Sequence, residues 1–369
     1  MTVGRSRAPL APEALFALLF LGLSGMEFLA APYGATRLLG PSSYWAVVVG
    51  LVLATPLLFL ARAWRRRFPG KSLVELGTTA LGRLLGTIGN LLFLATYLAW
   101  LIVSMRDAGD LVLAYLLDRT PLWAVIGFFL LGAVYVAANG LSTLSRLAEF
   151  VLIPALVLRL TMSLVSLQGM EASHLLPVFS ASPLAYLRGG LELLGTFLPL
   201  ASLFLLADLL PGPSQLFRSA LFATGSATVI LFSDALGAIG VFGADLAQEL
   251  AWPGLVAIHH VSFPYLLVEQ LGLLFLIVWL VSFFVAASFY LHLVAAGLVK
   301  AFPVLPRPRT AVGLALLVAF GGLILPNAAV VRTVFDGLRG WAMLPAAGYP
   351  FLVYLAAIIR GLGGRKHAA

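Results

Sequence analysis

The chain has 369 residues, 61% of them hydrophobic and 10% charged, and its mean hydropathy is +1.04. A soluble protein would carry roughly 25% charged residues, so the composition excludes a soluble fold. The formal net charge is +8, but the basic residues lie at the ends of apolar stretches, which argues against a nucleic-acid-binding face. The absence of cysteine excludes disulfides and thiolate metal sites.

Apolar stretches long enough to cross a bilayer, about 20 residues each, recur along the whole sequence. Because lipid offers the backbone no hydrogen-bond partner, these stretches predict an all-α membrane protein, with residues 1–369 forming a single membrane domain. In chain order we expect about ten spans, at 13–38, 43–64, 84–107, 121–138, 146–167, 184–208, 215–241, 265–298, 309–325 and 340–360.

The basic residues predict the orientation of these spans. Most of the 23 lysines and arginines fall on one side of the membrane if the N-terminus is cytoplasmic. The positive-inside rule therefore predicts that both termini are cytoplasmic, which requires an even number of spans. The densest basic group, RAWRRRFPGK at 62–71, is expected to fix this topology and to touch anionic lipid.

Two spans carry residues that weaken a helix midway across the membrane. The first contains GLSGMEFLAAP at 22–32, and the sixth contains GTFLP at 195–199. Glycine lowers helix stability by about 1 kcal/mol, and proline removes a backbone donor. Breaks at matching positions of two halves predict an inverted-repeat transporter fold, here with five-helix repeats at 1–167 and 184–360. The alternative is that these small residues only let helices pack closely.

Such breaks also suggest a class of ligand. Freed backbone N–H groups would face an anionic group and freed carbonyls a cationic one, so a zwitterion such as an amino acid matches both. The hydroxyls of Ser24 and Thr196 are placed to bond the loosened backbone.

The stretch GLSGMEFLAAP resembles the first-helix signature of the amino acid–polyamine–organocation transporter superfamily. More particularly, a basic cluster followed by FPGKSLVE and LGRLLG is similar to the GerAB-type B subunits of spore-germination receptors. The similarity continues through TPLWAVIGFFLLGAVYVAANGL, SRLAEFVLIPALVL, HLLPVF and FLIVWLVSFFVAASFYLHLVAAGL, and so covers nearly the whole chain.

The resemblance implies a ten-helix, LeuT-like fold with broken first and sixth helices, in the inner membrane of a bacterial endospore. It implies a subunit that binds a small nutrient, often an L-amino acid. Partners would be an oligomeric A-type membrane subunit and a C-type lipoprotein, and nutrient binding would open an ion path.

The resemblance also implies where the nutrient would bind. Tyr97 lies near the middle of the third span by the rise of a helix, and its neighbour Trp100 shares its face. Tyr97 and Phe283 have an alternative role as core aromatics, and Ser282 could instead bond its own helix. The implied pocket consists of Gly22, Ser24, Gly25, Met26, Tyr97, Gly195, Thr196, Phe197, Ser282 and Phe283.

Three charged residues are further candidates, and two of them, Glu27 and Glu192, lie next to the breaks. Glu27 and Glu192 would both lie on the outer side of the site, where they could attract a cation or the cationic end of a ligand. The alternative for Glu192 is a pair with Arg188 at i, i+4. Arg159 in the fifth span would be a fixed charge if it faced the site, but snorkelling to the outer surface is the expected arrangement.

The sequence thus leaves two main functions open. A nutrient-receptor subunit is favoured by the resemblance, and a cation-coupled amino-acid permease is the alternative because the fold supports both. We predict no enzymatic activity, because no HExxH, GxSxG or clustered acid motif appears. No cofactor or metal site is predicted.

Overall fold

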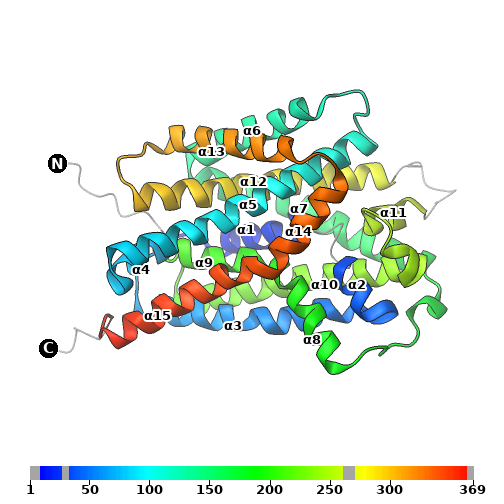
Figure 1. The fold of residues 1–369 in the computed structure, drawn as a ribbon, viewed down its shortest axis with the longest axis horizontal. Helices are drawn as coiled ribbons and strands as arrows, with labels where there is room; N and C mark the ends of the chain where they lie inside the picture. Colours follow the sequence, from blue (N-terminus) through cyan, green and yellow to red (C-terminus); the bar gives the residue numbers. More distant parts are fainter. Residues whose placement is uncertain (1–8, 27–32, 261–270, 364–369) are drawn as a thin grey trace.

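The computed structural model describes residues 9–26, 33–260 and 271–363. This part of the chain is mainly α-helical and contains no strand (Figure 1). The α-helices are α1 (Pro12–Gly25), α2 (Tyr33–Leu39), α3 (Trp45–Arg67), α4 (Leu73–Leu81), α5 (Arg83–Tyr115), α6 (Leu122–Asn139), α7 (Leu141–Ser166), α8 (Pro183–Glu192), α9 (Ser202–Leu205), α10 (Pro213–Ala247), α11 (Pro253–His260), α12 (Leu271–Ala301), α13 (Arg307–Ile324), α14 (Ala328–Met343) and α15 (Tyr349–Ile359).

The membrane spans follow the sequence prediction closely. Among the described residues, nine helical segments are long and apolar enough to cross a bilayer, and the 14-residue α1 is a shorter apolar helix. The predicted first span is divided into α1 and α2, and the predicted sixth into α8, the 3-10 helix η5 (Leu193–Ala201) and α9. Both predicted breaks therefore exist.

The tenth span starts earlier than predicted. Instead of beginning at residue 340, the membrane segment runs from Ala328 to Ile359, through α14, a π-helical turn at Leu344–Gly348 and α15. The first half of this span was not predicted because Arg332, Asp336 and Arg339 lower the hydropathy of that segment. A side-chain cap marks the true start, since the Asn327 side chain accepts a hydrogen bond from the Val330 N–H at 3.0 Å.

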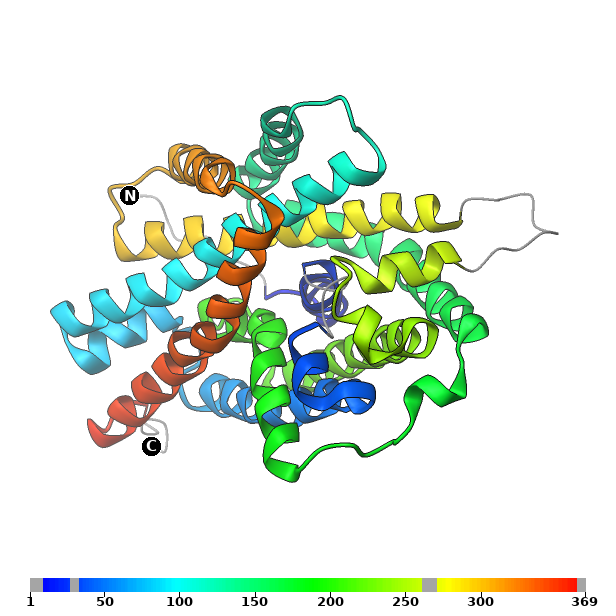
Figure 2. The same cartoon turned by 45° about the vertical axis from the view of Figure 1, so that its right-hand side comes forward.

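The helices run between two distinct ends of the molecule. In Figures 1 and 2, α4, the turn between α12 and α13, and the end of α15 lie at one end, called here the α4 end. The other, called the α11 end, holds α2, α11 and the turn between α5 and α6. Two sharp corners use glycines with positive φ, Gly82 (+85°) before α5 and Gly140 (+92°) before α7.

Helix α1 lies in the centre of the bundle. It contacts α7, α10 and α12, and eleven of its residues are buried. Two glycines allow this close packing. A Cβ atom placed on Gly22 would lie 3.3 Å from Cβ of Pro199 in η5. One placed on Gly25 would lie 3.0 Å from both the backbone oxygen of Ser282 and Cβ of Ala286 in α12. The two broken segments therefore meet.

We expect Gly25→Ala to lower the melting temperature of the purified protein, because the added methyl group forces α1 away from the α12 backbone and overpacking costs about 1–3 kcal/mol. The matched control is Gly225→Ala in α10, where an added Cβ meets no atom within 4 Å. The control should be neutral or stabilising, since alanine favours a helix by about 1 kcal/mol over glycine. Equal melting temperatures for the two variants would contradict the packing.

Candidate functional site

The two breaks meet beside α5, and Tyr97 joins them to it. The Tyr97 hydroxyl donates a hydrogen bond to the backbone oxygen of Leu198 at 2.9 Å, and the Ser202 hydroxyl donates to that of Pro199 at 2.6 Å. Tyr97, Leu198, Pro199 and Ser202 are all buried. A carbonyl buried in a membrane protein must find a donor, so these two side chains stabilise the interrupted backbone of η5.

Aromatic rings close around the same point. Tyr97 packs edge to face on Tyr290 of α12, with ring centroids 5.1 Å apart. Trp100 lies over Gly195, where a Cβ atom would come within 2.6 Å of its ring. Trp100 also packs edge to face on Phe335 of α14 at 5.7 Å. Because Gly195 has no side chain, the Trp100 ring fits against the η5 backbone. The buried indole of Trp100 thus contacts both η5 and α14 from α5.

The remaining predicted pocket residues divide into two groups. The Ser24 hydroxyl donates to the backbone oxygen of Phe20 at 2.6 Å, and that of Ser282 donates to Val278 at 3.0 Å. Both hydroxyls thus bond their own helix in this structure, which is the alternative given above for Ser282. Met26 is buried just after the end of α1, and Thr196 is buried in the middle of η5.

Two predicted aromatics point elsewhere. Phe197 is directed toward α3, where its ring would lie 3.1 Å from a Cβ atom on Gly50. Phe283 packs against Phe129 of α6 at 5.8 Å and stacks on Trp279 at 5.5 Å. The structure therefore brings together five of the predicted pocket residues where α1, η5, α5 and α12 meet: Gly22, Gly25, Tyr97, Gly195 and Ser282. Phe197 instead packs against α3, and Phe283 packs against α6.

A cavity lies on each side of this meeting point. One, of about 580 Å³, opens at the α4 end between the start of α1, the α6–α7 turn, α9 and α12. Its polar lining includes Ser145, Glu149 and Lys300, and Lys300 is paired with Asp208 at 2.7 Å. The other, of about 200 Å³, lies at the α11 end between α5, the segment before α11 and α14.

The smaller cavity reaches down to the broken helix. Phe335 and Arg339 line it, and the Arg339 Cα would lie 3.3 Å from a Cβ atom on Gly195. Trp100 packs on Phe335, which lines this cavity, and Trp100 also lies against Gly195 of η5. The smaller cavity therefore lies next to residues that contact the interrupted helix.

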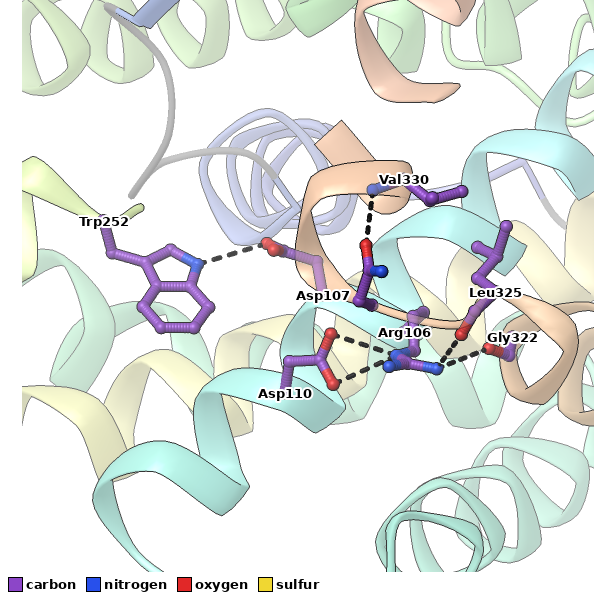
Figure 3. Close-up of polar contacts among 8 residues, drawn as sticks. Arg106, Asp107, Asp110, Trp252, Gly322, Leu325 and Val330 are labelled. Carbon is purple, nitrogen blue, oxygen red and sulfur yellow. Dashed lines mark hydrogen bonds and ion pairs between the residues drawn. The ribbon is translucent and has the colours of Figure 1, made fainter. Parts of the chain in front are cut away.

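A polar network lies beside the smaller cavity, and two of its members, Asp107 and Trp252, line that cavity (Figure 3). The Arg106 Nε–H is shared between the two Asp110 carboxylate oxygens at 3.0 Å each, and Nη1 donates to the backbone oxygens of Gly322 and Leu325 at the end of α13. The Trp252 indole N–H donates to the Asp107 carboxylate at 3.5 Å. These contacts tie α5 to α13 and to the segment before α11.

Of the predicted charged residues, Glu27 lies outside the described residues. Glu192 is half-buried at the end of α8, and one of its carboxylate oxygens would lie 2.8 Å from a Cβ atom on Gly34 of α2. The charges that act on it belong to Asp336, Arg339 and Arg37. Glu192 therefore lies where α2, α8 and α14 come together, toward the α11 end.

The expectation that Arg159 snorkels is wrong. Its side chain is 1% exposed, and its charge interacts with that of Asp234 on α10, which is also buried. The Ser163 hydroxyl donates to the same carboxylate at 3.4 Å. The segment after α7 folds back onto α10, where the Glu171 N–H bonds the backbone oxygen of Gly240 at 2.9 Å. Pairing with a carboxylate offsets the cost of burying the guanidinium.

Sequence reasoning assigned Asp234 no role, although a signal was present. It is a carboxylate near one end of a predicted apolar span, and such residues in membranes usually have a partner. The sequence could not show which residue that partner would be, because Arg159 and Asp234 lie 75 positions apart in the numbering and on different helices.

Solved structures with the same architecture are transporters. Mhp1, a nucleobase-cation-symport-1 family transporter solved with bromovinylhydantoin, matches 97% of this chain and 82% of its own, with a TM-score of 0.74 and 19% identity. MhsT in complex with L-phenylalanine matches 97% of this chain and 100% of its own, with a TM-score of 0.70 and 16% identity. The broken helices and these matches define a multi-pass membrane protein of the LeuT-like transporter fold.

The family model Spore_permease, described as "Spore germination protein", matches residues 10–328, and the chain belongs to this family. Among relatives from Bacillus subtilis (strain 168), spore germination protein YndE is 26% identical over 70% of both chains. Spore germination protein B2 is 21% identical over 93% of this chain and 94% of its own. The chain accordingly has a germinant-receptor or transporter-like role.

We expect Tyr97→Phe to lower the free energy of unfolding by about 1–3 kcal/mol, because it leaves the buried Leu198 carbonyl without its donor. Tyr135→Phe is the control, since Tyr135 is 69% exposed on α6. Thermal melts in one detergent would compare the two variants. A Tyr97→Phe protein as stable as the control would show that the hydrogen bond contributes nothing.

We expect Asp234→Asn to destabilise the protein by about 3–5 kcal/mol, because it leaves the Arg159 charge buried without compensation. Asp245→Asn, at an exposed position of the same helix, should have little effect. The double variant Arg159→Met/Asp234→Asn should recover part of the loss, as a double-mutant cycle would measure. Strict additivity of the two single changes would rule out the pairing.

Proposed function

We propose that this chain is the nutrient-binding subunit of a spore germinant receptor, and that it recognises a small zwitterion, an L-amino acid, where its two broken helices meet. The observation that carries the proposal is the contact of Gly22 in α1 with Pro199 in η5, beside the hydrogen bond from Tyr97 to Leu198. In this proposal the helical repeats are 1–167 and 184–360.

Two features support a zwitterionic ligand. Interrupted helices offer N–H groups to a carboxylate and carbonyls to an ammonium group, which a small amino acid carries on neighbouring atoms. The cavity next to the break is lined by residues of both signs, Asp107 and Glu249 together with Arg332 and Arg339. Glu192 on the same side would draw the cationic end of the ligand toward α2 and α14.

The chain would act in the spore inner membrane, with its α4 end toward the core. The basic residues Arg65, Arg66 and Arg67 at the end of α3, with Arg307 and Arg309 at the start of α13, gather at that end, and the positive-inside rule places them on the cytoplasmic side. Ligand binding would then change the contacts that A- and C-type subunits make with it and trigger ion release. Relatives named spore germination protein A2 and KB support such an assembly.

A cation-coupled amino-acid permease is the second candidate. Alternating access opens the site to one side of the membrane at a time, and a cavity at each end of the molecule gives such a path a start on both sides, which favours this function. The two candidates share the binding site and differ in whether the ligand crosses.

We expect a panel of L-amino acids to include one that stabilises the purified protein by about 2 kcal/mol or more at tens of its Kd. Gly195→Ala should abolish this thermal shift, because the added methyl group displaces Trp100 over the break. Gly225→Ala is the control. Ligand-induced melting shifts and counterflow in liposomes are the measurements.

Binding without counterflow is the result expected of a receptor, and binding with counterflow identifies a permease. A protein that gives no shift with any amino acid, while its variants melt cooperatively, would overturn the proposed ligand class.

A further inference from the structure

A basic groove at the α4 end has no part in the function proposed above. It is a cavity of about 450 Å³ between the last turns of α3 and α15. Arg62, Arg66 and Arg67 of α3 line it, together with Tyr354 of α15 and Phe59 one turn earlier in α3. Three guanidinium groups therefore surround one hollow at the end of a membrane span.

Two of the three arginines, Arg62 and Arg67, have a hydrogen-bond donor without an acceptor in the part of the sequence that the structure describes. The Nε atoms of Arg62 and Arg67 are buried and have no hydrogen-bond acceptor within the described part of the chain. Neither of these side chains, nor that of Arg66, pairs with a carboxylate among the described residues. A buried donor without an acceptor is costly, so the groove is built for an acceptor that the described chain does not supply.

The neighbouring Arg65 shows the contrast. Its Nε donates to the backbone oxygens of Leu210 and Pro211 at 3.1 and 3.2 Å, and so it joins α3 to the segment before α10. Within about two turns of helix, Arg65 bonds a neighbouring segment while Arg62, Arg66 and Arg67 line a groove. A single role as a topology anchor does not account for this division.

The groove also holds its arginines in place and adds an apolar wall. The Arg62 guanidinium lies 5.1 Å from the ring centroid of Phe217 on α10, which restricts its rotamers. Phe59 packs on the same ring at 5.1 Å and is itself 55% exposed. A ligand on the arginines would therefore have an exposed aromatic surface beside it, on the side of the membrane span.

Phosphate is the anion that suits this set. Guanidinium groups bind its oxygens in bidentate fashion, and an arginine cluster at the end of a span is where lipid headgroups lie. We propose that the groove between α3 and α15 binds the phosphate of an anionic phospholipid, with an acyl chain along Phe59. Free phosphate shares the headgroup chemistry but leaves the exposed face of Phe59 without a partner.

The test uses the purified full chain in a neutral detergent and three ligands: short-chain phosphatidylglycerol, the matching phosphatidylcholine, and inorganic phosphate. Phosphatidylglycerol should raise the melting temperature in a saturable way. Phosphatidylcholine and phosphate at the same concentration should not. An equal shift with inorganic phosphate would assign the groove to a free anion, and an equal shift with phosphatidylcholine would show no selective site; either result overturns the proposal.

Matched charge variants separate a site from general attraction. Arg62→Gln/Arg67→Gln should raise the apparent Kd for phosphatidylglycerol roughly tenfold or more. Arg83→Gln/Arg309→Gln removes the same charge from exposed positions at the same end and should change it less than about threefold. Equal losses in the two double variants would overturn the proposal.

Two further variants keep the result independent of folding. Arg62→Lys/Arg67→Lys keeps the charge and should still weaken binding, since lysine lacks the planar fork. Phe59→Ala should weaken phosphatidylglycerol binding through the acyl chain. An unchanged Kd in both would refute the groove as the lipid site, whatever the amino-acid panel shows.

Discussion

Inside a bilayer every backbone polar group must find its partner within the protein, and the rest of this structure depends on that constraint. Continuous helices satisfy it by themselves, whereas η5 does not follow the regular α-helical pattern. Its carbonyls at Leu198 and Pro199 take hydrogen bonds from the hydroxyls of Tyr97 and Ser202. Tyr97 thus adds a hydrogen bond from α5 to the backbone of η5, which makes α5 part of the candidate site.

Small residues set the distances at which this arrangement works. Gly22 lets α1 touch Pro199, Gly25 lets it touch the α12 backbone, and Gly195 makes room for Trp100. The proposed ligand site is therefore closely packed, and Tyr97 and Trp100 both contact η5 there. A movement of Trp100 would change its contact with Phe335 of α14, and a movement of Tyr97 would break its hydrogen bond to η5. Such a link is what a receptor needs in order to report occupancy to other subunits.

Charge has two separate uses in this fold. Arg159 of α7 and Asp234 of α10 are both buried, and their charges interact. This interaction stabilises the packing of α7 against α10. At the end of α3, Arg65 bonds the segment before α10, whereas Arg62, Arg66 and Arg67 line a groove at the α4 end. The first pair resists change within the bundle, while the second group makes the α4 end responsive to the lipids around it.

The sequence by itself determined the helical class, the positions of the spans before the tenth and the two breaks, because hydropathy, glycine and proline act locally along the chain. It also singled out Tyr97 and Gly195, whose neighbours the structure then supplied. Only the tertiary structure decided that Phe283 faces α6, that Arg159 is buried against Asp234, and that the tenth span begins at Ala328. Those outcomes depend on which helices lie side by side, and contacts between residues far apart in the chain leave no periodic signal in one sequence.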